Sequence, residues 1–241
     1  MRNILIILIF SLTLASEPIA IVTKVRGKAF LQKNKQKLMV NSPLRSQDEI
    51  MVSSKSFLKL LFLDDGTSVN LFSETSVLLK GNVEDRKIQK HLTLYSGTVQ
   101  VQVNPQLNGE FKLITNHSEL TCDNCSFWAS APEEGEDKFY KIDNKAMVHN
   151  PSMVINRELK SDSTLFSIQG KDPYYQKTSV SEQKMFELLL MDAEESPSTE
   201  KQDMEITASD SALVPIQNLL RIKLINAANI ERELILTYTR E

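Results

Sequence analysis

The sequence predicts a mainly β fold with one helix near its C-terminal end. Short apolar or alternating runs follow one another from residue 19 to about residue 168, and Asp-Gly and Ser-Gly pairs part some of them. Such a series is typical of a β-sandwich, roll or barrel, and a helical period fits none of these runs well. A run with helical spacing and a capping residue comes only after residue 180.

The first residues have the layout of a secretory signal peptide. A short positive start is followed by the almost continuously apolar stretch 4–14, and Thr13 and Ala15 offer small residues for cleavage after Ala15. The alternative, a retained anchor, needs about 20 apolar residues to cross a bilayer. We therefore expect segment 1–15 to be removed, and the mature chain to be exported to a periplasm or cell envelope without a transmembrane anchor.

The strands are expected in a regular order after that segment. Phe57 to Leu63 and Ser68 to Phe72 flank Asp65-Gly66, a hairpin signal because glycine supplies a positive φ. Residues 98–103 alternate strictly between apolar and polar, and Ser96-Gly97 reads as a weaker turn before them. The remaining expected strands are near residues 21–25, 29–31, 38–40, 49–52, 76–79, 91–95, 111–115, 139–148, 153–155 and 165–168.

Three further segments follow the strands. Residues 181–193 read as a capped amphipathic helix that closes a β-domain of residues 16–193. Residues 194–205 are polar, contain Pro197, and read as a flexible linker. The tail 206–241 keeps a helix-like apolar spacing, and we predict a helix there, although two strands around Asn226 and Asn229 are an alternative reading.

Several of these motifs, taken together, resemble the FecR domain family. The stretch 60–71, with Asp65 and Gly66, is similar to the family's central strand–turn–strand signature. Gly27 matches a glycine enclosed by its opening strands, and Asp48 matches a Gly-Asp turn that here reads Gln47-Asp48. The similar stretches cover about residues 19–130 and also include the Leu-x-Leu-x-x-Gly-x-Val pattern with Gly97, the strand 111–115, and a Gly-Thr-x-Phe element represented by Asn124 and Phe127.

Two positions depart from that family pattern. Gln47 replaces a glycine, so its turn must differ or bear strain. Asn124 also replaces a glycine, and asparagine is the best non-glycine residue at a left-handed φ. The resemblance implies a β-domain concerned with regulation, because transmembrane members of the family sense a partner outside the cell and control a sigma factor inside it.

Both cysteines lie in the stretch Thr121-Cys122-Asp123-Asn124-Cys125. An oxidising compartment favours a local disulfide at a turn, with the next residues continuing as a strand. Free or intermolecular thiols are one alternative. A zinc site that recruits His117 and His149 is another, although their spacing fits no standard arrangement and we expect no metal.

The charged residues suggest one binding surface and no catalytic centre. Asp64-Asp65 reads as part of a turn, and Glu133-Glu134 as a solvated acidic loop. A basic first hairpin could meet anionic envelope polymer or lipid headgroups, or its lysines could protect a sheet edge from pairing. This hairpin contains the cations Lys24, Arg26, Lys28, Lys33, Lys35 and Lys37, with no acid among them.

Composition and motifs limit the function classes. A net charge of −3 argues against a general nucleic-acid binder, which needs a basic surface. No nucleophile elbow, phosphate-binding glycine loop or HExxH motif occurs, so we expect neither an enzyme nor a cofactor. The sequence favours an exported, non-catalytic binding or scaffolding module whose partner is an unknown envelope protein or polymer. The alternatives are a structural or adhesion component and, less favoured, an uncharacterised hydrolase.

Overall fold

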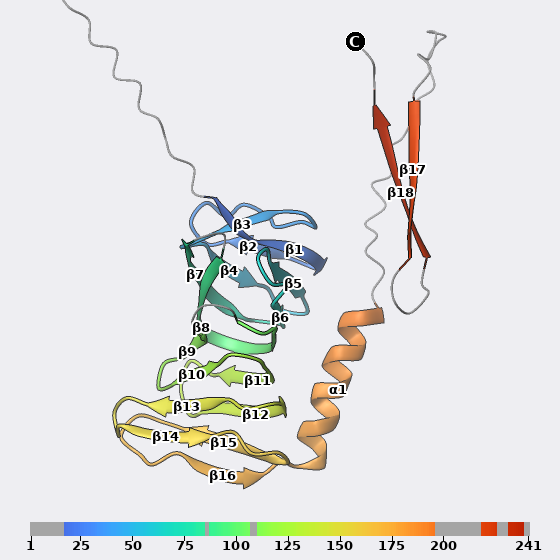
Figure 1. Cartoon of the computed structure of the whole chain (residues 1–241). Coiled ribbons are helices and arrows are strands. Elements are labelled where there is room, and N and C mark those ends of the chain that lie inside the picture. Colours follow the sequence, from blue (N-terminus) through green and yellow to red (C-terminus); the bar gives the residue numbers. More distant parts are fainter. Residues whose placement is uncertain (1–16, 85–86, 107–109, 196–217, 226–230, 239–241) are drawn as a thin grey trace, which may run out of the picture. The chain divides into compact units, whose positions relative to one another are not determined.

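The computed structural model describes residues 17–84, 87–106, 110–195, 218–225 and 231–238 (Figure 1). The chain divides into two compact units, residues 1–199 and 200–241. The predicted signal peptide and most of the predicted linker lie outside the described residues, so both stay predictions. The first two linker residues, Glu194 and Glu195, belong to the helix that precedes it.

The first unit is mainly β, as predicted, and most of its strands are short. They are β1 (Pro18–Arg26), β2 (Ala29–Leu31), β3 (Pro43–Arg45), β4 (Glu49–Val52), β5 (Phe57–Phe62), β6 (Ser68–Leu71), β7 (Ser76–Glu84), β8 (Lys87–Val103), β9 (Phe111–Ile114), β10 (Glu119–Cys122), β11 (Cys125–Ala131), β12 (Asp137–Asp143), β13 (Met147–Asn150), β14 (Ile155–Glu158), β15 (Ser163–Ser167) and β16 (Tyr174–Lys177).

The strands form two sheets that share β8. Sheet A has the order β3-β1-β5-β6-β8-β11-β12-β15-β16, and sheet B has the order β2-β4-β7-β8-β9-β10-β13-β14. The chain passes repeatedly from one sheet to the other, which gives the stacked strands of Figure 1. All pairs are antiparallel except β8 with β9. Because β8 belongs to both, the two sheets are continuous, and the fold is mainly β.

Gly97 marks the point where β8 passes from sheet B to sheet A. Residues 87–96 pair with β7, and residues 97–103 pair with β11. The expected turn at Ser96-Gly97 is therefore wrong, because the chain bends here within one strand. Gly97 has φ +98°, and an added Cβ would lie 2.5 Å from the Cα of Thr75. Both the positive φ and the close approach require glycine.

Side chains from both sheets meet in one core, which explains the alternating sequence runs. In β5, Leu58, Leu60 and Phe62 are fully buried, and in β8 Leu92 and Leu94 are buried in the same cluster. Alternate residues of a strand point to the same face. The period-2 pattern therefore places one apolar face of each sheet in this core.

Helix α1 (Val180–Glu195) confirms the predicted helix and packs on a second, aromatic cluster. Its start is capped, because the Glu182 carboxylate accepts hydrogen bonds from the Ser179 backbone N–H and hydroxyl, both at 2.9 Å. Phe186 stacks on Trp128 with ring centroids 4.6 Å apart, and Trp128 in turn stacks on Phe72 at 4.9 Å. The only tryptophan of the chain is therefore the residue on which the helix docks.

Two expectations about local structure are corrected. Residues 38–40 are not a strand, because a single bridge joins Phe30 to Lys37 and residues 39–42 then turn. The predicted helix in the tail is also wrong. Residues 218–225 and 231–238 are the antiparallel strands β17 (Asn218–Ile225) and β18 (Glu231–Tyr238). These are the two strands of the alternative reading, and the alternation in Arg221-Ile222-Lys223-Leu224 is the pattern that indicates them.

Candidate functional site

The Asp65-Gly66 motif connects β5 to β6, and a buried lysine holds it in place. The two strands pair antiparallel, and Gly66 has φ +74°. The Lys90 side chain is 1% exposed, and its Nζ lies 2.7 Å from Asp64 Oδ2 and 3.0 Å from Asp65 Oδ2. Lys90 also donates to Gln106 Oε1 at 2.9 Å. A cation from β8 that the sequence pattern did not single out thus compensates one of the two negative charges of the acidic pair.

The Asp65 carboxylate is held in its ionised form. Burial by itself raises its pKa, but hydrogen bonds from the Thr67 N–H, Lys90 and Gln106, with the Lys90 charge, together hold the pKa below its ordinary value. Thr67 N donates to Asp65 Oδ1 at 2.8 Å, and Gln106 Nε2 donates to Oδ2. All these partners come from the same chain, so the motif acts as an internal fastening of the loop.

The other turn residues of the family pattern take up strained or crowded positions. Gly27 has φ +75°, and an added Cβ would lie 2.4 Å from Ser56 Oγ. Gln47 has φ +73°, so this turn keeps a glycine-like backbone and bears the expected strain. The Asp48 carboxylate accepts from Arg45 N at 2.7 Å, and Leu79 O accepts from Gln47 N at 2.8 Å. These bonds hold the strained residue in place.

The two cysteines lie where the chain crosses from sheet B to sheet A. Cys122 ends β10 and Cys125 begins β11, and their sulfur atoms are 2.01 Å apart, at bonding distance. Phe127 continues β11 and is buried, as expected for the strand after the motif. Asn124 is exposed and is not among the residues with positive φ, so its expected left-handed conformation is wrong. The crossing needs no such residue because β10 and β11 do not pair with each other.

The two histidines considered as zinc ligands have other partners. His117 Nε2 lies 3.1 Å from Gly135 O, and His149 Nδ1 lies 2.8 Å from Asn156 Oδ1. Within the described residues, no group of three or more His, Cys, Asp or Glu side chains could hold a metal ion.

The basic residues of the first hairpin lie on β1 and on the loops around β2. Lys24 and Arg26 belong to β1 and are half-buried, whereas Lys28, Lys33, Lys35 and Lys37 are exposed. The register sets Lys24 opposite Lys59 of β5, so a further cation joins this surface. Like charges directly opposite on neighbouring strands are destabilising. The alternative reading, in which the lysines only protect a sheet edge, does not explain why Lys24 lies opposite Lys59.

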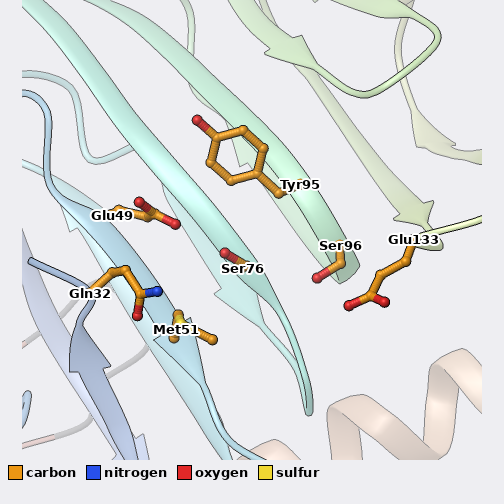
Figure 2. Close-up of a pocket in the computed structure, with 7 residues that line it drawn as sticks. All are labelled: Gln32, Glu49, Met51, Ser76, Tyr95, Ser96 and Glu133. Atoms are coloured by element: carbon orange, nitrogen blue, oxygen red, sulfur yellow. The ribbon is translucent and has the colours of Figure 1, made fainter. Parts of the chain in front are cut away.

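A polar hollow of about 400 Å³ lies over sheet B, at the level where β8 bends. Figure 2 shows Glu49 and Glu133 at opposite ends of a row of hydroxyls from Ser76 and Ser96, with Tyr95 beside it. The Tyr95 side chain is 41% exposed although it lies on a central strand. Gln32 and Met51 complete the lining, and Lys35 Nζ donates to Gln32 Oε1 at 2.6 Å.

Both charged groups that line this hollow are acidic. No ion pair of Glu49 or Glu133 occurs within the part of the chain that the structure describes. Glu133 is exposed, as expected for a solvated loop, and it lines the hollow together with residues of β4, β7 and β8. The sequence pattern places Tyr95 in a strand and indicates no binding role for it. Its position directly before Ser96-Gly97 is the sequence signal that could have identified it as a residue of the hollow.

The buried carboxylate of Asp137, at the end of the Glu133 loop, accepts hydrogen bonds from the segment between β9 and β10. Asp137 is fully buried at the start of β12, and its Oδ2 accepts from Thr115 Oγ1 at 2.5 Å and from His117 N at 3.1 Å. Its Oδ1 has no hydrogen-bond partner among the residues that the structure describes. Burial raises the pKa of Asp137, and the bonds from Thr115 and His117 offset this only in part. Asn116 then reaches Tyr95 O at 3.3 Å, so this network borders the hollow.

In the stretches that the structure describes, no helix is long and apolar enough to span a membrane.

Comparisons with known proteins gave few matches. No family model matches the chain, and no curated protein matches it. Among solved structures, it is similar to two crystal structures of a provisionally assigned anti-sigma factor from Parabacteroides distasonis. The identities are 15% and 16%, the TM-scores are 0.47 and 0.48, and each match covers 57% of this chain and 63% of the other. The chain thus matches less than two thirds of the length of those structures, and the similarity to FecR domains remains a reading of its motifs.

Proposed function

We propose that this chain is an exported, non-catalytic binding module of the cell envelope, built on a FecR-like β-domain. The observation that supports this proposal is the hollow beside Tyr95. Its floor consists of paired strands, so its side chains are held on a rigid frame, as a binding site needs. Its lining offers hydrogen-bonding groups, one aromatic ring and two carboxylates.

The chemistry of the lining favours a positively charged segment of a partner polypeptide. Carboxylates such as Glu49 and Glu133 attract Lys or Arg side chains, and the exposed Tyr95 ring can stack on a guanidinium group. The serine hydroxyls between them can accept or donate hydrogen bonds to a backbone. A role in envelope sensing would follow if that partner carries a signal.

A titration with short labelled peptides tests the binding proposal. The chain of residues 16–241 should bind an arginine-rich peptide more tightly than an aspartate-rich one. Glu49→Gln with Glu133→Gln should weaken that binding about tenfold, because two partly exposed ion pairs are worth roughly 0.5–1 kcal/mol each. Asp172→Asn with Glu187→Gln removes the same charge from exposed positions that do not line the hollow.

Equal weakening by the two double variants would contradict the proposal, since net charge alone would then explain the binding. Export is checked separately by N-terminal sequencing of the protein from the envelope fraction. A mature chain that begins near Ser16 is expected, and an intact Met1 would contradict export.

A further inference from the structure

The basic end of the domain also carries exposed apolar side chains. From residue 18 to residue 47 the sequence has no acid and contains Arg45 in addition to the six cations of the first hairpin. The chain as a whole carries −3, so positive charge is concentrated in this segment. Within it, Met39 is 63% exposed and Val40 is 43% exposed.

Local hydrogen bonds present these apolar residues on an ordered turn. Leu38 is buried and its N–H donates to Ala29 O at 2.8 Å, which fixes the chain just before the turn. Met39 N donates to Ser42 Oγ at 2.9 Å, and Asn41 N donates to Val22 O at 2.8 Å. Leu38 is thus tied to β2 and Asn41 to β1, and Met39 and Val40 between them are exposed.

The lysines lie on the adjoining turn. Lys33 and Lys35 belong to residues 32–36, which Leu31 N closes by donating to Gln36 O at 2.9 Å. Four residues of chain span at most about 14 Å, so the exposed residues Lys35 and Met39 lie no farther apart than that. Exposed cations beside exposed apolar side chains are the combination that binds anionic bilayers, by attraction to headgroups and shallow insertion of the apolar groups.

We propose that the turns 32–36 and 39–42 form a contact surface for an anionic lipid bilayer. The lysines provide attraction to the charged headgroups, and Met39 and Val40 enter the headgroup region. A soluble anionic polymer would use the cations but would give the apolar pair no role. The bilayer is therefore the occupant that accounts for both features. This surface borders the hollow beside Tyr95 at Gln32, which lines the hollow and accepts from Lys35 Nζ, but the proposal does not depend on a ligand there.

Vesicle co-sedimentation tests this surface. Residues 16–241 are used because they contain every described residue and exclude the apolar stretch 4–14, which could insert by itself. We expect binding to phosphatidylglycerol–phosphatidylcholine vesicles, weak binding to phosphatidylcholine alone, and loss of binding at high salt. Lys33→Gln with Lys35→Gln should weaken binding about 30-fold, at about fivefold per lysine. Met39→Ser with Val40→Ser should weaken it severalfold.

Matched variants elsewhere on the domain serve as controls. Lys171→Gln with Lys177→Gln removes two exposed lysines, and Met153→Ser with Val154→Ser changes a second exposed Met-Val pair. Neither should affect binding, and nor should Glu49→Gln with Glu133→Gln. Equal binding to neutral vesicles, or equal losses in variant and control, would overturn the proposal. It would also fall if dextran sulfate bound as tightly and the Met39 and Val40 changes had no effect.

Discussion

Buried charge in this domain occurs in two forms with opposite consequences. Lys90 meets two carboxylates and an amide, so its charge is compensated at the base of the Asp65-Gly66 loop. Asp137 accepts from Thr115 and from the His117 N–H, and within the described ranges its other oxygen has no hydrogen-bond partner. The pKa of Asp65 is lowered and that of Asp137 is raised, because partners outweigh burial at the first and do not at the second.

Asp137 predicts a specific dependence of stability on pH. Because its folded pKa lies above the unfolded value of 3.8, the folded chain binds more protons just above pH 3.8, and stability falls as the pH rises through this window. Asparagine does not titrate, so Asp137→Asn removes this loss. The unfolding free energy of the variant should therefore rise relative to that of the wild type as the pH increases from 4 to 7. Each unit of pKa elevation corresponds to about 1.4 kcal/mol.

Urea unfolding of both proteins at several pH values measures this difference. Asp143→Asn changes an exposed carboxylate and should show no comparable trend. A difference between wild type and Asp137→Asn that stays constant with pH would refute the prediction.

At the scale of elements, the crossings between the two sheets are the constrained points of the chain. Gly27 separates β1 of sheet A from β2 of sheet B, Gly97 lies within β8, and the cysteines join β10 to β11. Sequence reasoning treated all three as turns between neighbouring strands. They connect strands of different sheets, so their geometry determines how the sheets face each other.

Gly97→Ala should destabilise the domain more than Gly170→Ala does. Both glycines have positive φ, which costs an alanine roughly 1–2 kcal/mol. An added Cβ at Gly97 also meets the Thr75 backbone at 2.5 Å, whereas nothing lies within 4 Å at Gly170. Thermal or urea unfolding of the two variants measures the difference, which should exceed about 1 kcal/mol. Equal losses of unfolding free energy would mean that the backbone around Gly97 and Thr75 moves apart at little cost, which would contradict the prediction.

The cysteine pair should contribute modestly to stability. A bridge across such a short loop stabilises the fold by roughly 2 kcal/mol in the chain-entropy model. Its loss should lower the melting temperature by about 4–8 °C for a domain of this size. Cys122→Ser with Cys125→Ser should therefore melt earlier but remain folded, and bind no zinc. Non-reducing mass spectrometry should find the wild-type chain two protons lighter than its reduced form. Two free thiols in freshly prepared envelope protein would refute the bridge.

At the scale of the whole molecule, we predict that proteases cut first within residues 196–205. This segment is polar and contains Pro197, so little of it can be buried. Limited proteolysis followed by mass spectrometry should leave a stable fragment that ends near the end of α1. A first cut at Asp65-Gly66 would contradict the division, and the internal fastening of that loop by Lys90 argues against such a cut.

The sequence by itself determined the features that depend on local pattern. Period-2 alternation predicted the β class, Ser181 followed by Glu182 predicted the start of α1 to within a residue, and Asp65-Gly66 marked the β5–β6 connection. These predictions succeeded because alternation, capping and positive φ depend on residues close together in the chain.

Only the tertiary structure decided which distant residues meet. Lys90 is buried because β8 passes beside the loop of Asp64 and Asp65, and no spacing in the sequence encodes that neighbour. Glu133 and Glu49 share a hollow because a loop after β11 reaches sheet B. The tail was predicted as a helix because its apolar spacing fits both periods, and strand pairing between β17 and β18 resolves the ambiguity. Long-range pairing is a property of the whole chain, so it cannot be read from a local window.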